Sequence, residues 1–473
     1  MPRVHAGGGS ATLEARGLTP ARHKSAARPA PPGLAARALA HDLIAGVLID
    51  RRPLDQVVAD ALAQPEAAME PRDRAFARLL AATVLRRQGE LELVLGAFLE
   101  RPLTKAGSAG RRAWPILLAG TAQILCLDTS PHAAVDLAVE AARSDPETAR
   151  FASLANAVLR RVAREGATVL SGQDAVRLNI PGWAWQRWEK AYGADTARRI
   201  AEATLKEPPL DLSLKPGVDA AAWAQRLGGH VLPTGSVRLA GHGRVEDLAG
   251  YAEGAWWVQG AAAALVARAA GDVAGRAIAD LCAAPGGKTA GLAAAGAQVT
   301  AVDDSPERLE RLRQNLARLN LAADVITADA AKWAPGRTFD AVVLDAPCSG
   351  TGTISRHPDI LRLKGPADVR RMAEVQGALL RNAATLVRPG GTLVYATCSL
   401  EPEEGRAQID ALLEHEPALQ RAPIAAGEIG ADPSWVVGGD VRTLPFHLAE
   451  GDLSGLDGFC IARLRRSGAR PLA

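Results

Sequence analysis

The stretch that decides the fold runs from Asp280 to Thr289 and reads Asp-Leu-Cys-Ala-Ala-Pro-Gly-Gly-Lys-Thr. It lies between a candidate strand and an alanine-rich helical stretch, and this position predicts a tight strand-to-helix turn. Glycines in such a turn let backbone N–H groups approach a ligand, and the start of the helix favours negative charge. The spacing fits neither GxGxxG nor GxxxxGK[ST], the motifs of NAD and ATP sites. The turn therefore indicates a nucleotide-like ligand and argues against NAD and ATP.

Short β-type runs alternate with helical stretches on both sides of this turn and beyond it. The candidate strands are 277–282, 298–303, 323–327, 341–346, 392–398 and 458–463. Such alternation is typical of βαβ units with a parallel sheet. We therefore expect residues 271–466 to form a doubly wound, Rossmann-like α/β domain.

Acidic residues follow the second and third candidate strands. Asp303 comes about 20 residues after the glycine-rich turn, where an acid is placed to accept hydrogen bonds from ribose hydroxyls. Asp304 is the alternative, and the sequence does not decide between the two. Asp329 follows the third strand, in the usual place to meet an adenine amino group. Without a cofactor these acids would be helix caps and loop residues, but their order along the sheet favours an adenosine site.

Two cysteines follow strands four and five. Cys348 lies in Asp345-Ala-Pro-Cys-Ser and Cys398 in Tyr395-Ala-Thr-Cys-Ser. Reacting groups gather at the carboxyl ends of the strands in open α/β sheets. If the two strands are neighbours, both thiols face one cleft.

The other three of the five cysteines, Cys126, Cys282 and Cys460, have the contexts of small buried residues. An odd cysteine count without CxxC spacing or a signal peptide argues against a disulfide framework and a zinc site. We therefore expect no metal and a location in the reducing cytoplasm.

Two thiols and a carboxylate beside an adenosine site suggest one reaction. A thiolate that adds to C6 of cytosine makes C5 nucleophilic toward an electrophilic methyl group. A carboxyl group at N3 stabilises the charge that develops there, and a base then removes the C5 proton. The cytosine must be single-stranded or flipped out, because a stacked base does not expose both faces. Proximity alone does not decide which thiol is the nucleophile.

The remaining regions differ in composition. We predict a disordered tail at 1–33, favoured over a transit peptide, a helical domain at 34–166, a mixed α+β linker at 167–270 and a short tail at 467–473. A net charge of +3 excludes a polybasic coat protein, and no apolar run is long enough to span a membrane. Arginines 160, 161 and 164, with no acid evident nearby, either contact phosphates or form a solvated helix face. Tryptophans at 183, 185, 188, 223, 256 and 257 either stack on bases or, more commonly, belong to the core.

The run from Asp280 to Glu404 resembles the RNA (cytosine-5)-methyltransferases. With the helical region in front, the chain resembles the RsmB (Fmu/Sun) family of 16S rRNA methyltransferases, which carry an N-terminal NusB-like RNA-binding domain. Matching pieces include Asn156-Ala-Val-Leu-Arg-Arg, Arg356-His-Pro-Asp and Asp457-Gly-Phe-Cys. The resemblance implies a monomeric, cytoplasmic enzyme of rRNA processing with a class I methyltransferase fold. One departure is Gly260, where the family pattern has an acid after Gln259.

The resemblance also implies the site. It assigns S-adenosylmethionine to the turn, together with Asp303, Asp329 and Asp345; the residues of the turn are Cys282, Ala283, Ala284, Pro285, Gly286, Gly287 and Lys288. It makes Cys398 the nucleophile, while Cys348 assists release of the methylated base. We expect Asp345 to be catalytic as well, and Lys288 to hold either Asp345 or the carboxylate of the cofactor. His357 is either a general base or part of a structural turn.

Two other functions compete with this one. The first is an enzyme that performs the same reaction on tRNA or 23S rRNA in place of 16S rRNA. A non-catalytic RNA-binding factor would use the helical domain and merely retain the α/β fold. The presence of both thiols, the glycine-rich turn and all three acids argues against that second alternative.

Overall fold

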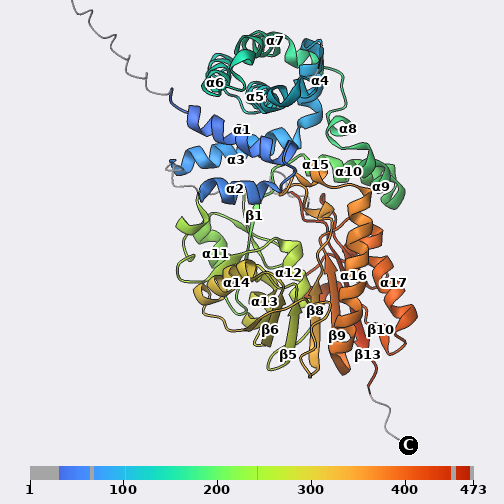
Figure 1. Ribbon diagram of the computed structural model, residues 1–473. Coiled ribbons are helices and arrows are strands. Elements are labelled where there is room, and N and C mark those ends of the chain that lie inside the picture. Colours follow the sequence, from blue (N-terminus) through green and yellow to red (C-terminus); the bar gives the residue numbers. More distant parts are fainter. Residues whose placement is uncertain (1–30, 64–68, 102, 242, 449–453, 469–473) are drawn as a thin grey trace, which may run out of the picture.

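The computed structural model describes residues 31–63, 69–101, 103–241, 243–448 and 454–468. A helical tier formed by the N-terminal part of the chain stands on a larger α/β tier (Figure 1). Of the predicted tails, only residues 31–33 and 467–468 fall within the described ranges. No helix in these ranges is long and apolar enough to cross a lipid bilayer.

The helical tier is built from alanine-, leucine- and valine-rich helices, and prolines mark the starts of three of the seven helices described. Pro71 and Pro131 begin α3 and α6, and Pro53 directly precedes α2. The apolar faces pack into one core, and the last helix continues beyond the predicted boundary at residue 166. The helices are α1 (Leu34–Leu48), α2 (Leu54–Leu62), α3 (Pro71–Arg86), α4 (Gln88–Phe98), α5 (Gly107–Cys126), α6 (Pro131–Ser144) and α7 (Ala152–Leu170).

The predicted arginine cluster lies on the exposed side of α7. Arg161 and Arg164 each lie 3.4 Å from a carboxylate oxygen of Glu165. Arg160 Nε donates to Asn156 Oδ1 at 3.0 Å. The expectation of a cluster without a nearby acid is therefore wrong, because Glu165 follows within the same helical turn. These contacts favour an ordinary solvated helix face.

The middle of the chain contains three helices and a small antiparallel sheet. The sheet has the order β2-β3-β1-β4 and is flanked by two further helices. Its elements and their neighbours are α8 (Ala175–Asn179), α9 (Gly182–Tyr192), α10 (Ala194–Thr204), β1 (Leu210–Leu214), α11 (Ala220–Leu227), β2 (His230–Val231), β3 (Val237–Leu239), β4 (Trp256–Val258) and α12 (Ala261–Arg268).

The tryptophans of this region belong mainly to its core. Trp188, Trp256 and Trp257 are buried, and the half-buried Trp183, Trp185 and Trp223 pack against the same clusters. Trp188, Trp256 and Trp257 are therefore core residues, as the more common of the two interpretations predicts.

The large sheet of the lower tier confirms all six predicted strands. Within the described residues its order is β11-β12-β13-β9-β8-β5-β6-β7, with β10 paired to β13. Strands β5 to β9 run parallel, whereas β13 is antiparallel to β9. The predicted strands are β5 (Ala277–Leu281), β6 (Gln298–Asp303), β7 (Asp324–Thr327), β8 (Phe339–Asp345), β9 (Val387–Thr397) and β13 (Cys460–Arg466). The strand order reverses between β5 and β8, and ligands of such sheets bind at this switch point.

Helices connect the parallel strands as expected. Ser305 caps α14, its Oγ accepting from Arg308 N at 3.2 Å, and Leu309, Leu312 and Leu316 form the predicted buried stripe. The connecting helices are α13 (Gly287–Ala294), α14 (Pro306–Arg318), α15 (Ile360–Leu363) and α16 (Pro366–Leu386). After β9 come α17 (Arg406–His415) and α18 (Ala426–Ile429).

Three short strands of the large sheet were not predicted. They are β10 (Leu419–Arg421), β11 (Val436–Val437) and β12 (Asp440–Arg442), all within or near residues 418–439. Each has only two or three residues, too few for an alternating pattern to show in the sequence. Short 3-10 turns complete the fold: η1 (Leu103–Lys105), η2 (Ala149–Phe151), η3 (Val245–Asp247), η4 (Thr351–Thr353), η5 (Pro402–Glu404) and η6 (Pro433–Trp435).

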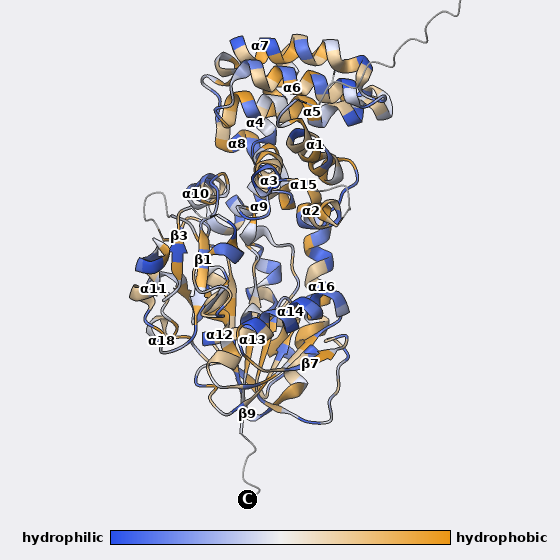
Figure 2. Cartoon of the chain, turned by 90° about the vertical axis from the view of Figure 1, so that its left-hand side faces the viewer, coloured by the Kyte–Doolittle hydropathy of each residue, from blue (hydrophilic) through white to orange (hydrophobic). Residues whose placement is uncertain are grey.

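The helical tier rests on the segment that follows Cys348. Figure 2 shows α2, α3 and α15 where the two tiers meet. Leu54 N donates to Asp359 Oδ2 at 3.2 Å, and an Arg86 guanidinium N–H donates to the Ser355 carbonyl at 2.9 Å. The helical tier is thus hydrogen-bonded to the chain just beyond the cysteine loop.

Candidate active site

The two candidate thiols meet at the carboxyl ends of neighbouring strands. Cys348 follows β8 and Cys398 follows β9, and these strands pair in parallel. The two Sγ atoms lie 3.4 Å apart, within hydrogen-bonding distance for sulfur. The structure thus confirms that strands four and five are neighbours and that the two thiols lie side by side. The hydrogen bond with Cys398 and burial together hold the pKa of Cys348 well above its ordinary value, so Cys348 is a neutral thiol at physiological pH.

A carboxylate and an ammonium group pair at the same edge of the sheet. Asp345 ends β8, and its Oδ2 forms an ion pair with Lys288 Nζ from the first turn of α13. Burial lowers the pKa of Lys288, but the charge and hydrogen bond of Asp345, together with the nearby Cys398 and Asp280, raise it overall. Lys288 therefore stays protonated. Of the two partners expected for it, Asp345 and the carboxylate of the cofactor, the structure shows the contact with Asp345.

The glycine-rich turn has the shape that its sequence predicts. Gly286 is the N-cap of α13 with a φ of 102°, a conformation that favours glycine. A Cβ on Gly286 would lie 2.9 Å from Leu312 Cγ. Cys282 also has a positive φ, 58°, and burial raises the pKa of its thiol. The turn thus places backbone without side chains, at Gly286 and Gly287, at the switch point of the sheet.

Asp303 contacts this turn, whereas Asp304 does not. The Asp303 carboxylate is buried at the end of β6 and accepts from Ala284 N at 3.2 Å and Ser305 N at 3.0 Å. Arg308 pairs with both acids, but the Asp304 side chain is 71% exposed and accepts no hydrogen bond from the turn among the described residues. Asp303 is therefore the better placed of the two candidate acids.

Asp329 lies beyond the end of β7 with a half-exposed side chain. Its Oδ1 accepts from Ala331 N at 2.9 Å, and its Oδ2 lies 3.2 Å from Lys332 Nζ. The backbone hydrogen bond with Ala331, followed by the contact with Lys332, lowers its pKa. These are the contacts of a loop acid, and they leave the Asp329 carboxylate partly open to solvent.

Comparisons with known proteins agree with this geometry. The family model described as 16S rRNA methyltransferase RsmB/F matches residues 271–465, and that of the NusB family matches residues 34–164. The chain is 36% identical over 402 residues to the ribosomal RNA small subunit methyltransferase B of Vibrio cholerae, covering 80% of this chain and 89% of the relative. It is also 36% identical over 380 residues to the protein of that name in Salmonella arizonae, covering 77% of this chain and 85% of the relative.

The chain belongs to the RsmB/F family. It is thus an S-adenosylmethionine-dependent RNA methyltransferase, as the resemblance implied. Among solved structures, that of PH0851 superposes with a TM-score of 0.70 at 22% identity, covering 92% of this chain and 99% of the other. At that identity the superposition shows the fold alone.

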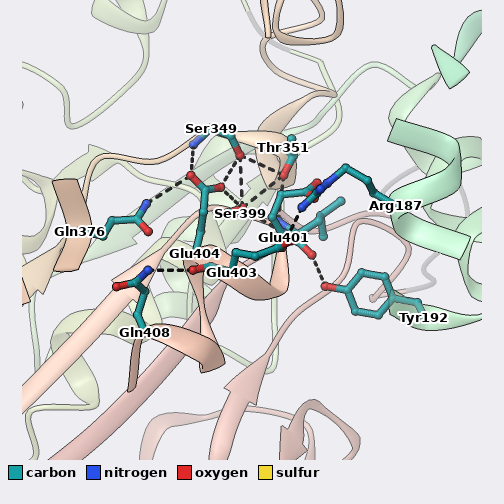
Figure 3. A network of polar contacts seen from close by, with 11 residues as sticks. Arg187, Tyr192, Ser349, Thr351, Gln376, Ser399, Glu401, Glu403, Glu404 and Gln408 are labelled. Carbon is teal, nitrogen blue, oxygen red and sulfur yellow. Dashed lines mark hydrogen bonds and ion pairs between the residues drawn. The ribbon is translucent and has the colours of Figure 1, made fainter. Parts of the chain in front are cut away.

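A buried carboxylate behind the two thiols was missed by sequence reasoning. Glu404 accepts from Ser349 N at 2.8 Å, from Ser349 Oγ at 2.5 Å and from Ser399 Oγ at 2.5 Å. Figure 3 shows these bonds converging on one side chain. Ser349 follows Cys348 and Ser399 follows Cys398, so Glu404 ties together the two cysteine loops of this family member. In the sequence Glu404 ends the run that resembles the RNA methyltransferases, but nothing there indicates that it contacts both cysteine loops.

The linker region also contacts the Cys398 loop. Arg187 of α9 pairs with Glu401, which is fully buried, and lies 2.7 Å from Glu403 (Figure 3). The hydroxyl of Tyr192 donates to the Leu400 carbonyl. Helix α9 thereby holds the segment that follows Cys398 at Leu400, Glu401 and Glu403.

His357 contacts the helical tier and not a group of the cysteine pair. Its Nδ1 lies 3.2 Å from Asp55 Oδ2 of α2. Burial lowers the pKa of His357, but the hydrogen bond and charge of Asp55 raise it overall. The hydrogen bond with His357 is in turn the main reason that the pKa of Asp55 falls to about 2. These contacts favour a structural role.

We expect the His357–Asp55 pair to stabilise the protein in a limited pH window. Because the pKa of His357 is raised in the fold, its contribution is full below the unfolded-state pKa of about 6.5 and fades as pH rises through the folded value. Both side chains are more than a third exposed, so the His357→Gln variant should lose only about 0.5 kcal/mol at pH 6 and nothing at pH 9. Denaturant unfolding at both pH values measures this.

The same variant separates the two roles considered for His357. A structural residue leaves methylation within about threefold of the parent chain, whereas loss of a general base costs about 10²-fold or more. Activity lowered by that amount, or an equal loss of stability at both pH values, would contradict this prediction.

Proposed function

We propose that the enzyme transfers a methyl group from S-adenosylmethionine to C5 of a cytosine in 16S rRNA through a covalent bond between Cys398 Sγ and C6. The observation that carries this proposal is the 3.4 Å separation of the Cys348 and Cys398 sulfurs beside Asp345. The names of the curated relatives support small-subunit rRNA as the substrate.

The residues of the switch point fit the methyl donor. Bare backbone at Gly286 and Gly287, the start of α13 and the buried Asp303 carboxylate form a set of donors and acceptors suited to an amino acid joined to a nucleoside. We propose that the turn 282–288 binds this ligand, with Asp303 on the ribose, Asp329 at the adenine and Asp345 at the edge of the same site. When bound, the ligand supplies an electrophilic methyl group.

Cys398 acts on the other reactant, the cytosine. Its thiolate forms the Sγ–C6 bond, and the electron pair of the C5–C6 double bond makes C5 nucleophilic. Cys348 Sγ lies 3.4 Å from Cys398 Sγ, so a neutral Cys348 thiol can donate to the Cys398 thiolate and stabilise it. Asp345, next to the ammonium of Lys288, is placed to share a proton with N3.

Release of the product reverses the addition. The proton leaves C5 for a base, the double bond re-forms, and the electrons of the Sγ–C6 bond return to Cys398. We propose that Cys348 takes part in this step, since its sulfur is adjacent to that bond. The cytosine must be single-stranded or flipped out to reach the thiols.

We further propose a division of labour among the regions. The helical domain, residues 34–166, contacts rRNA, the linker 167–270 lies beside the RNA path, and residues 271–466 perform catalysis in a monomer. The contacts of Leu54 and Arg86 with the segment after Cys348 support coupling between RNA contact and the active site.

Bisulfite sequencing tests the substrate. We expect one cytosine of 16S rRNA to resist conversion in cells that contain the protein and to convert fully in cells that lack it. Cells that contain only the Cys398→Ala variant serve as the control, because they have the protein but should lack its methyl transfer activity. Protection confined to tRNA or 23S rRNA would establish the alternative substrate, and no difference at any 16S cytosine would refute the proposed one.

A further inference from the structure

A buried amide next to the glycine-rich turn lacks a partner. Gln259 lies between β4 and α12 and is 8% exposed. Its Oε1 accepts from Trp257 Nε1 and from Ser213 Oγ, each at 2.9 Å. Its Nε2 has no hydrogen-bond partner among the residues that the structure describes. Buried polar groups are nearly always paired, so this amide points to a ligand.

The orientation of the amide follows from its neighbours. The indole nitrogen of Trp257 can only donate, so the oxygen of Gln259 must face it and the NH₂ group must face the other way. Ser213 and Trp257 are cross-strand partners in β1 and β4. The small sheet therefore fixes which end of the amide is available.

The free end of Gln259 faces the start of α13. A Cβ on Gly287 would lie 3.2 Å from Gln259 Nε2. Gly286, the N-cap, offers no side-chain cap, and the helix makes its first backbone bond from Ala290 N to Gly286 O at 2.8 Å. The N–H groups of residues 287–289 precede that bond. A buried amide donor and an uncapped helix start thus converge on one place, which suits an anion.

We propose that Gln259 Nε2 donates a hydrogen bond to the carboxylate of the methionine part of S-adenosylmethionine. This carboxylate is the one anionic group of that ligand. Lys288, the other candidate for holding it, pairs with Asp345. The inference rests on the proposed cofactor site at 282–288 and adds a residue from outside the matched catalytic region, which begins at 271.

Ligand binding to the full-length chain tests this without turnover. The probes are S-adenosylhomocysteine, which keeps the carboxylate, and 5′-methylthioadenosine, which lacks the whole amino acid part. In Gln259→Glu an oxygen still accepts from Trp257 and Ser213, while the donor is lost. We expect calorimetry to show about 10- to 100-fold weaker binding of S-adenosylhomocysteine and 5′-methylthioadenosine affinity within about twofold of the parent. Gln259→Met should give the same pattern.

Ser213→Ala is the matched control, because it removes the hydrogen bond from Ser213 Oγ to Gln259 Oε1 but leaves the Nε2 donor of Gln259 in place. It should bind S-adenosylhomocysteine within about threefold of the parent chain. Unchanged S-adenosylhomocysteine binding by both Gln259 variants would overturn the inference, as would equal losses for the two ligands, which would mark a purely structural role. A parent chain that binds neither ligand would instead refute the proposed cofactor site itself.

Discussion

We expect the Cys398→Ala variant to lose methyl transfer by about 10³-fold or more. Without the Sγ–C6 bond, C5 of cytosine remains part of an electron-poor aromatic ring and does not attack an electrophilic carbon. In the proposed mechanism Asp345, paired with Lys288, acts on charge that develops only after this bond has formed. Incorporation of a radiolabelled methyl group into unmodified 16S rRNA measures the loss.

A second cysteine provides the control for Cys398→Ala. Cys126 lies at the end of α5 in the helical tier, and burial raises the pKa of its thiol to about 11. Cys126→Ala should therefore methylate at the parental rate. The Cys398 variant should also bind S-adenosylhomocysteine normally, because the turn 282–288 is unchanged. Retention of even a tenth of the parental rate by Cys398→Ala would rule out Cys398 as the nucleophile.

Much of the site was predictable because its residues follow strands. Each apolar run of β5, β6, β8 and β9 marks a strand in the sequence, and parallel strands bring the residues after them to one edge. The positions of Asp303, Cys348 and Cys398 follow from that rule alone. The choice between Asp303 and Asp304 does not, because it depends on which carboxylate turns back toward Ala284 N.

Other parts of the site could not be predicted, since they depend on contacts between distant segments. Gln259, the proposed ligand contact, precedes residue 271, and its amide lies beside the turn because Ser213 and Trp257 of the small sheet hold it there. Glu404 acquires its partners when Ser349, 55 residues earlier in the chain, folds next to it. His357 looks like a base in isolation, and its partner Asp55 belongs to another domain.

We expect the Cys348→Ala variant to stop after addition and to accumulate a covalent RNA adduct. Cys398 and the methyl-donor site are intact in this variant, so the Sγ–C6 bond still forms. Cys348 Sγ, 3.4 Å from Cys398 Sγ, is the group beside that bond when it must break. Turnover should therefore fall by about 10²-fold or more, while labelled RNA remains attached to the protein in a denaturing gel.

The double variant Cys348→Ala, Cys398→Ala identifies the adduct. If Cys398 is the attacking sulfur, the double variant forms no adduct, although it still contains Cys282, whose thiol lies in the same region of the sheet and has a raised pKa. An adduct in Cys398→Ala but not in Cys348→Ala would show that the two thiols have the opposite roles. The two sulfurs are too close for distance to distinguish these roles, but the adduct distinguishes them because only the nucleophile becomes bonded to C6.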